Sequence, residues 1–140
     1  MIVVDTSGLL AAYDRRSAEH QEVMRVLRDT QEPLMLSPFV LAELDYLLAT
    51  RLGTGAEKAA LRDVSDGVYL LMPFEQAAVR EAVELVEKYD RLDIGLADAS
   101  IVVAAARNRT TKVLTLDQRH FRTVKPLWGA AFTVLPADCN

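Results

Sequence analysis

Four acidic residues occupy positions from which their side chains could together bind divalent metal. Asp5 follows the short apolar run at residues 2–4, and Asp117 follows a second such run. Asp98 opens a third apolar segment, and Glu43 interrupts a fourth. Clusters of carboxylate oxygens suit hard cations, Mg²⁺ or Mn²⁺, better than softer metals. The pattern therefore predicts a divalent-metal site, with Mg²⁺ as the expected ion and Mn²⁺ as its substitute.

Each of these acids also has a structural interpretation. An aspartate after a strand or before a helix commonly caps the helix. Capping can explain Asp5, Asp98 or Asp117 individually, but it explains less well why all three would lie at one edge of the sheet. A carboxylate buried without a partner costs several kcal/mol in order of magnitude, so Glu43 within its apolar run needs a cation or a donor unless it lies on the surface. Asp45 is about 200° further around the same helix and cannot share its site.

Other catalytic chemistries have little support in the sequence. The chain has two histidines and one cysteine, and His20, His120 and Cys139 lack the spacing of a zinc site. The same scarcity argues against a Ser-His-Asp or Cys-His arrangement. We therefore expect the histidines to be ordinary surface or core residues.

Strands and helices alternate along the chain. The patterns predict strands at residues 2–4, 34–36, 68–71, 112–116 and 132–135, with helices at about 9–13, 17–28, 38–52, 56–65, 78–89 and from 98. The strands lack polar alternation, which is typical of a parallel sheet covered on both faces. We predict an α/β fold, a three-layer α/β/α sandwich with a mainly parallel sheet of about five strands.

This architecture predicts where the acids lie. Sites in open parallel sheets occupy the crevice outside the carboxyl ends of the strands. Asp5 and Asp117 each end a predicted strand, so neighbouring strands would bring their carboxylates close together. Asp98, at the start of a buried helix, can point into the same crevice.

Composition favours one domain, over residues 1–140. The chain is 51% hydrophobic, and nothing resembles a linker, a signal peptide or a membrane span, so we expect a cytoplasmic protein. Its net charge of −4 does not by itself suggest a nucleic-acid partner, although bound cations would offset clustered carboxylates. A local excess of basic residues near the C-terminal end could meet phosphates: Arg107, Arg109, Lys112, Arg119, Arg122 and Lys125.

The order of these motifs resembles the PIN-domain toxins of the VapC kind. The resemblance rests on four blocks, Asp5-Thr6-Ser7, Glu43 in a helix opened by proline, Asp98-Ala99-Ser100-Ile101, and Thr115-Leu116-Asp117 followed by His120-Phe121. The closing Pro126, Gly129, Phe132 and Leu135-Pro136 also fit, so the resemblance covers essentially the whole chain.

The resemblance implies a Mg²⁺-dependent endoribonuclease that cuts RNA phosphodiester bonds with a metal-activated water. It also implies a homodimer and inhibition by a cognate VapB-like antitoxin. Asp5, Glu43, Asp98 and Asp117 would form the catalytic, metal-binding quartet. Thr6 or Ser7 would orient carboxylates, as would Thr115, which shares a strand face with Asp117 by the two-residue period. Asp93 would be either a helper at the site or a residue that caps a turn.

Two other classes of α/β protein share part of this pattern. A response-regulator receiver also has an aspartate after its first strand and a pair like Lys125-Pro126, but it needs an acidic pair and a further aspartate after its third strand. A haloacid-dehalogenase-type phosphatase needs a second aspartate where Ser7 stands. A non-catalytic interaction domain, with the acids acting as helix caps, is the remaining alternative.

Overall fold

Five parallel strands form the centre of the molecule. We describe the protein from a computed structural model, which defines residues 1–139. The strands are β1 (Ile2–Val4), β2 (Leu34–Leu36), β3 (Leu70–Leu71), β4 (Lys112–Leu114) and β5 (Thr133–Leu135), and their order in the sheet is β3-β2-β1-β4-β5. All four neighbouring pairs are parallel. The predicted α/β class and strand number are confirmed.

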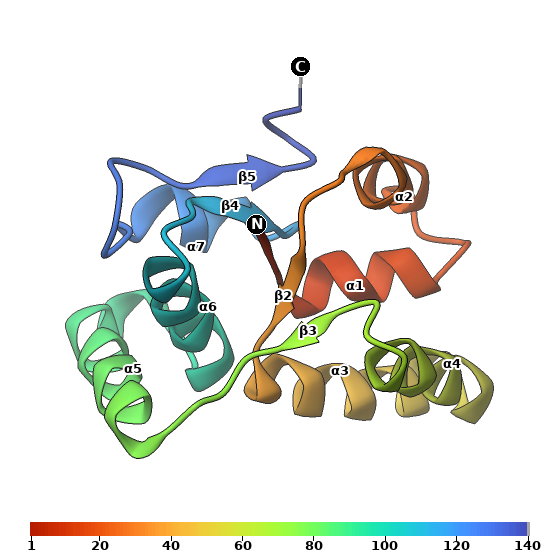
Figure 1. The fold of residues 1–140 in the computed structure, drawn as a ribbon, viewed down its shortest axis with the longest axis horizontal. Coiled ribbons are helices and arrows are strands. Elements are labelled where there is room, and N and C mark those ends of the chain that lie inside the picture. The colour runs from red at the N-terminus through yellow and green to blue at the C-terminus, as the bar shows by residue number, and fades with distance from the viewer. Residues whose placement is uncertain (140) are drawn as a thin grey trace.

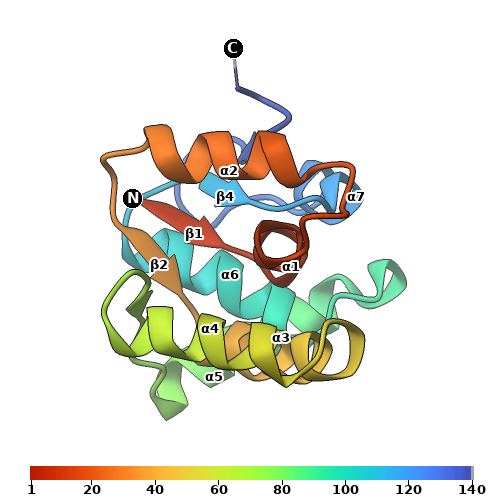
Figure 2. The same cartoon turned by 90° about the vertical axis from the view of Figure 1, so that its right-hand side faces the viewer.

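Helices cover both faces of this sheet. They are α1 (Thr6–Tyr13), α2 (His20–Asp29), α3 (Pro38–Arg51), α4 (Thr54–Ser65), α5 (Gln76–Lys88), α6 (Leu96–Arg107) and α7 (Gln118–Thr123), with a short 3-10 helix η1 (Asp90–Leu92) before α6. Figure 1 shows α1 and α2 on one side of the strands and α5, α6 and α7 on the other. In Figure 2, α2 and α6 lie on opposite sides of β1. This is the predicted three-layer arrangement.

The path of the chain creates a crevice beside β1. From β1 the chain moves outward through β2 to β3 at one edge, and then returns to β4 on the other side of β1. Such a reversal leaves an opening at the carboxyl ends of the two strands that flank it. Asp5 and Asp117 follow these two strands, so the topology alone brings them to one place. A receiver of the kind built on strand order 2-1-3-4-5 does not have this arrangement.

Local sequence explains how the two longest apolar helices are placed. Ser37 caps α3, because its hydroxyl oxygen accepts a hydrogen bond from Phe39 N, and Pro38 takes the first helical position. Helix α6 is apolar on nearly every side because it packs against β1, β4, α3 and α5. No helix in residues 1–139 is long and apolar enough to span a membrane.

Several predicted boundaries were wrong by a few residues. Helix α6 begins at Leu96, so Asp98 lies inside its first turn and does not cap it. Strand β4 ends at Leu114, before Thr115, and the predicted strand 68–71 is reduced to Leu70–Leu71. Helix α7 had not been predicted; its six residues are too few for a periodic apolar pattern to show.

Gly8 lets α1 approach the end of β4. A Cβ atom at this position would lie 2.7 Å from the carbonyl oxygen of Leu114, which is too close for any real contact. We expect Gly8→Ala to lower the free energy of unfolding by roughly 1–3 kcal/mol, because α1 or β4 must shift. Urea unfolding measures this change. Gly55→Ala in α4 is the control, since no heavy atom lies within 4 Å of its new Cβ, and it should gain about 0.5–1 kcal/mol. Equal effects from both would exclude the close approach as the cause.

Candidate metal-dependent active site

The carboxyl ends of β1 and β4 open into an acidic pocket of about 630 Å³. Five acids line it, from four separate parts of the chain: Asp5, Glu43, Asp93, Asp98 and Asp117. Thr6 and Ser7 line it as well, whereas Thr115 lies behind it. The structure thus brings the four predicted metal-binding residues together. We call this cavity the acidic pocket.

Asp5 is the most buried acid of the pocket, with 4% of its surface exposed. Its Oδ1 accepts a hydrogen bond from Thr6 N at 2.7 Å, so Asp5 caps α1. Its Oδ2 accepts hydrogen bonds from the hydroxyls of Ser7 at 3.0 Å and Thr115 at 2.6 Å. Burial raises the pKa of the Asp5 carboxyl, and these hydrogen bonds oppose the rise. Both interpretations of Asp5 therefore apply, since it caps a helix and also faces the pocket.

The hydroxyl of Thr115 acts on a different carboxylate from the one expected. Sequence periodicity paired it with Asp117, as neighbours on one strand face. Because β4 ends at Leu114, Thr115 lies outside the strand, and its hydroxyl donates to Asp5. The Thr115 oxygen accepts the backbone N–H of Asp117 at 3.0 Å and lies 3.1 Å from the Ser7 hydroxyl, but it makes no bond to the Asp117 carboxylate. Thr115 therefore orients Asp5, together with Ser7.

Asp98 carries the clearest electrostatic strain. Burial raises its pKa from 3.8 to about 6, and the negative charges of Asp5, Asp117 and Glu43 add to the rise, while His120 opposes it. Ionising Asp98 thus costs more in the folded protein than in water, and a bound cation would offset that cost. Asp98 is therefore a candidate ligand for a cation.

His120 is the site residue that the sequence analysis missed. Helix α7 places its Nδ1 3.1 Å from Asp98 Oδ2 and 2.9 Å from Asp117 Oδ2. Its other ring nitrogen, Nε2, lies 3.0 Å from the carbonyl oxygen of Leu92 and so carries a hydrogen. Nδ1 is buried, and neither carboxylate meets it in hydrogen-bond geometry. The spacing of three residues from Asp117, at the start of a helix, was the available signal.

Asp117 caps α7, and Glu43 stands at the rim of the pocket. The carboxylate of Asp117 accepts a hydrogen bond from His120 N at 3.2 Å. Glu43 is exposed, so of its two interpretations the surface position at the edge of the apolar face applies, and its carboxylate needs no buried partner. Its neighbours Val40 and Leu44 take the buried face of α3 and leave Glu43 on the side facing the pocket. Its charge nevertheless reaches Asp5 and Asp98, whose pKa values it raises.

Asp93 lies on the pocket wall in an unusual conformation. It ends η1 with φ of 54°, in the left-handed region that aspartate tolerates better than most residues. It is exposed, and it takes part in the turn before α6 as well as lining the pocket. Both interpretations of Asp93 therefore remain open.

The side chains of the pocket suit a hard cation. The candidate ligands are oxygen atoms, and the buried hydroxyl of Thr6 on the pocket wall has no hydrogen-bond partner within the protein. Within residues 1–139, no three acids or histidines already form a complete ligand set. Carboxylates gathered in one pocket repel one another, and a bound cation would offset that repulsion. Two buried polar atoms, Thr6 Oγ1 and His120 Nδ1, have no hydrogen-bond partner in the protein and could interact with a bound ion or its water.

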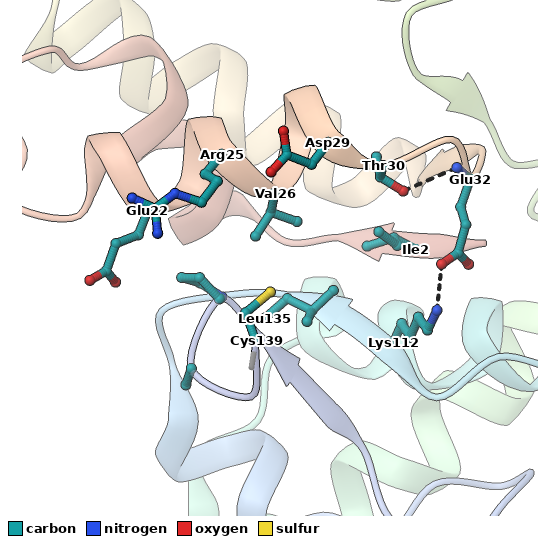
Figure 3. A pocket seen from close by; sticks show the side chains of 12 residues that line it. Ile2, Glu22, Arg25, Val26, Asp29, Thr30, Glu32, Lys112, Leu135 and Cys139 are labelled. Atoms are coloured by element: carbon teal, nitrogen blue, oxygen red, sulfur yellow. Dashed lines mark hydrogen bonds and ion pairs between the residues drawn. The ribbon is translucent and has the colours of Figure 1, made fainter.

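A second hollow, of about 570 Å³, lies away from these acids and shares no lining residue with them. Figure 3 shows it between α2 and the end of β5. At one end of this hollow Lys112 donates to Glu32, which also pairs with the N-terminal amine. None of the predicted site residues lines this hollow, so the acidic pocket is the candidate active site.

A crevice of carboxylates at the switch point of a parallel sheet defines a class of metal-dependent hydrolases, and comparison with known proteins narrows it. The PIN-domain family profile matches residues 2–126. The chain belongs to the PIN-domain family. It is 44% identical over 135 residues to Ribonuclease VapC26 of Mycobacterium tuberculosis, which spans 96% of this chain and 100% of that protein.

Solved structures agree with this assignment at the level of fold. VapC20 of Mycobacterium tuberculosis, a sarcin-ricin loop cleaving toxin, superposes with a TM-score of 0.79 at 24% identity, over 84% of this chain and 91% of that one. A toxin-antitoxin complex from Klebsiella pneumoniae gives 0.68 at 18% identity, over 92% and 100%. The VapC-like prediction is confirmed, and the receiver and phosphatase alternatives are excluded.

Proposed function

We propose that residues 1–140 form one nuclease domain that acts in the cytoplasm as the endoribonuclease toxin of a VapBC-type pair. The observation that carries this proposal is the meeting of Asp5, Glu43, Asp98 and Asp117 in one pocket at the carboxyl ends of β1 and β4. Family membership and the ribonuclease VapC26 relative support the same activity.

Asp5, Asp98, Asp117 and Glu43 would hold Mg²⁺, or Mn²⁺ in its place. When bound, the cation acidifies a water and withdraws charge from the phosphate being cut. Asp5 is held rigid for this role by the hydroxyls of Ser7 and Thr115. His120 would help position Asp98 and Asp117, because its Nδ1 lies within 3.1 Å and 2.9 Å of their carboxylates and its ring is fixed by the carbonyl of Leu92.

The rim of the pocket determines how RNA can enter. Glu43 and Asp93 are exposed at its mouth, whereas Asp5 lies at its base. A phosphodiester that reaches the base must therefore pass close to two carboxylates, which favours entry only when cations offset their charge. Hydrolysis with departure of the 3′ oxygen would leave a 5′ phosphate and a 3′ hydroxyl.

The same acids suit a protein inhibitor. An arginine from the tail of a VapB-like antitoxin could pair with two carboxylates at once and replace the cation. Solved relatives include toxins in complex with antitoxins, which supports a partner of this kind. If replacement of every arginine in the cognate tail leaves inhibition unchanged, this mode of inhibition does not operate.

We also propose that the chain forms a homodimer. Its surface exposes large apolar side chains on several elements, among them Tyr46 of α3 with 67% of its area accessible and Val83 of α5 with 44%. The proposal follows from the family resemblance, and these side chains are available to an interface. Light scattering at micromolar concentration measures the mass, and a strict monomer would contradict the proposal.

The activity is tested with the purified chain and labelled structured RNA. We expect cleavage with Mg²⁺ or Mn²⁺, none with EDTA, and recovery when excess Mg²⁺ is restored, because the proposed chemistry needs a cation to acidify the attacking water. Gel analysis of the fragments, with enzymes that need a 5′ phosphate, identifies the ends. Cleavage that persists in EDTA, or fragments with 3′ phosphates, would point to another mechanism or a contaminating ribonuclease.

A further inference from the structure

Arg51 lies on the wall of the acidic pocket, although no motif drew attention to it. It occupies the last turn of α3 and is exposed. Of the residues in 1–139 that line this pocket, it is the only basic one, against five acids. Its position must be explained because an arginine near so many carboxylates would ordinarily be found paired with one.

No such pair forms. Among residues 1–139, Arg51 makes no ion pair within 4.0 Å and no side-chain hydrogen bond. Three basic residues of the C-terminal segment behave differently, since Arg107 pairs with Glu81, Lys112 with Glu32 and Arg122 with Asp138. Arg51 therefore retains a charge and a planar set of donors that the fold does not use.

The helix places Arg51 in a row with two other pocket residues. Glu43, Leu47 and Arg51 follow one another at intervals of four positions, so they share one face of α3, and all three line the pocket. Eight residues at 1.5 Å each put Arg51 about 12 Å along the helix axis from Glu43. The row thus begins at the carboxylate of Glu43, continues over the apolar side chain of Leu47, and ends at the unpaired guanidinium of Arg51.

We propose that Arg51 binds a phosphate of the RNA strand beside the phosphate that is cut, with Leu47 beneath the intervening nucleotide. The proposal deepens the proposed ribonuclease function and rests on it. Guanidinium groups bind phosphate through two parallel hydrogen bonds, and such contacts set the register of a nucleic acid without reading its sequence. An antitoxin tail is the less suitable occupant, because a tail that neutralises five acids carries positive charge and Arg51 would repel it.

RNA affinity and turnover test this role separately. In Mg²⁺, Arg51→Ala should raise KM for cleavage about fivefold, the effect of losing one exposed charge pair, and change kcat less than twofold. Affinity is measured by fluorescence anisotropy with a short fluorescein-labelled single-stranded RNA of mixed sequence, which the Asp98→Asn background leaves uncut. In that background Arg51→Ala should weaken RNA affinity by the same factor. The slope of log affinity against log KCl should fall by about 0.7. Arg51→Lys should keep the slope.

Arg28→Ala is the matched control. Arg28 is exposed, occupies the last turn of α2 as Arg51 does that of α3, and lies outside the acidic pocket, so it shares the favourable effect of a cation at a helix C-terminus. It should leave KM and the salt slope unchanged. Equal effects of the two substitutions, unchanged RNA affinity in Arg51→Ala, or a loss confined to antitoxin binding would each overturn the proposal. Failure of the ribonuclease function itself is distinguishable, because then the Asp98→Asn background would still cut RNA or the wild type would not.

Discussion

Asp98→Asn is expected to cleave RNA at least about a thousandfold more slowly than the wild type, while keeping its fold. The substitution keeps the size of the side chain and removes the charge on which the proposed cation site depends. Burial and its acidic neighbours raise the pKa of Asp98 to about 6, so its charge is costly in the folded protein and favours binding of a compensating cation. Asp5→Asn should lose as much activity, because the Asp5 carboxylate forms the buried base of the same pocket.

The rates are compared as initial cleavage of labelled RNA in Mg²⁺, and circular dichroism reports the fold. Asp66→Asn removes a carboxylate from the C-terminal end of α4, outside the acidic pocket, and should retain wild-type activity. Wild-type rates in either pocket variant would mean that the site has been assigned wrongly. A comparable loss in Asp66→Asn would show that net charge, and not the pocket, controls the rate.

In EDTA, Asp98→Asn is expected to be more stable than the wild type, by an amount that grows with pH. The folded pKa of Asp98 is raised from 3.8 to about 6, so between these values the folded protein binds more protons than the unfolded chain. The contribution of this group to stability is therefore present below pH 4 and is lost as pH rises through 6, a difference of about 1–3 kcal/mol by pH 7. Asp5, whose pKa is also raised, acts in the same direction.

Urea unfolding from pH 4 to pH 7.5 measures this difference. Comparing the two proteins at each pH removes the opposite trend from Glu32 and Asp138, whose pKa values are lowered by hydrogen bonds from Lys112 and Arg122. Mg²⁺ or Mn²⁺ should stabilise the wild type by about 2.7 kcal/mol at a hundredfold excess over Kd, and the variant by less. If the wild type is indifferent to millimolar metal and the variant is less stable at every pH, the aspartates are helix caps only.

The fold could be predicted because each strand and most helices have a recognisable local sequence pattern. Each strand is an apolar run too short to be a helix, and the Ser37-Pro38 pair marks the start of α3 unambiguously. The errors fall at boundaries that tertiary contacts decide. Thr115 has a strand-like sequence and its N–H still bonds to Leu135 O of β5, but the strand ends at Leu114 and its hydroxyl donates to Asp5.

The site could be predicted only as far as strand ends reveal it. Asp5 and Asp117 each follow a predicted strand, so they meet if those two strands are neighbours in the sheet. The structure shows that these strands, β1 and β4, are paired. His120 was not expected, since its contacts with Asp98 and Asp117 need a short helix that has no sequence signature. Arg51 could have been found, because its distance of eight positions from Glu43 is visible in the sequence.

The edge strand β3 protects the sheet from growth. Its side chains Leu70 and Leu71 are about half exposed, a composition that in a longer strand would invite another chain to pair with it. Because β3 has only two residues, another chain that paired with it would form very few backbone hydrogen bonds. The protein can therefore display apolar side chains at this edge, where they are open to contacts through their surfaces, without offering a template for amyloid-like polymerisation.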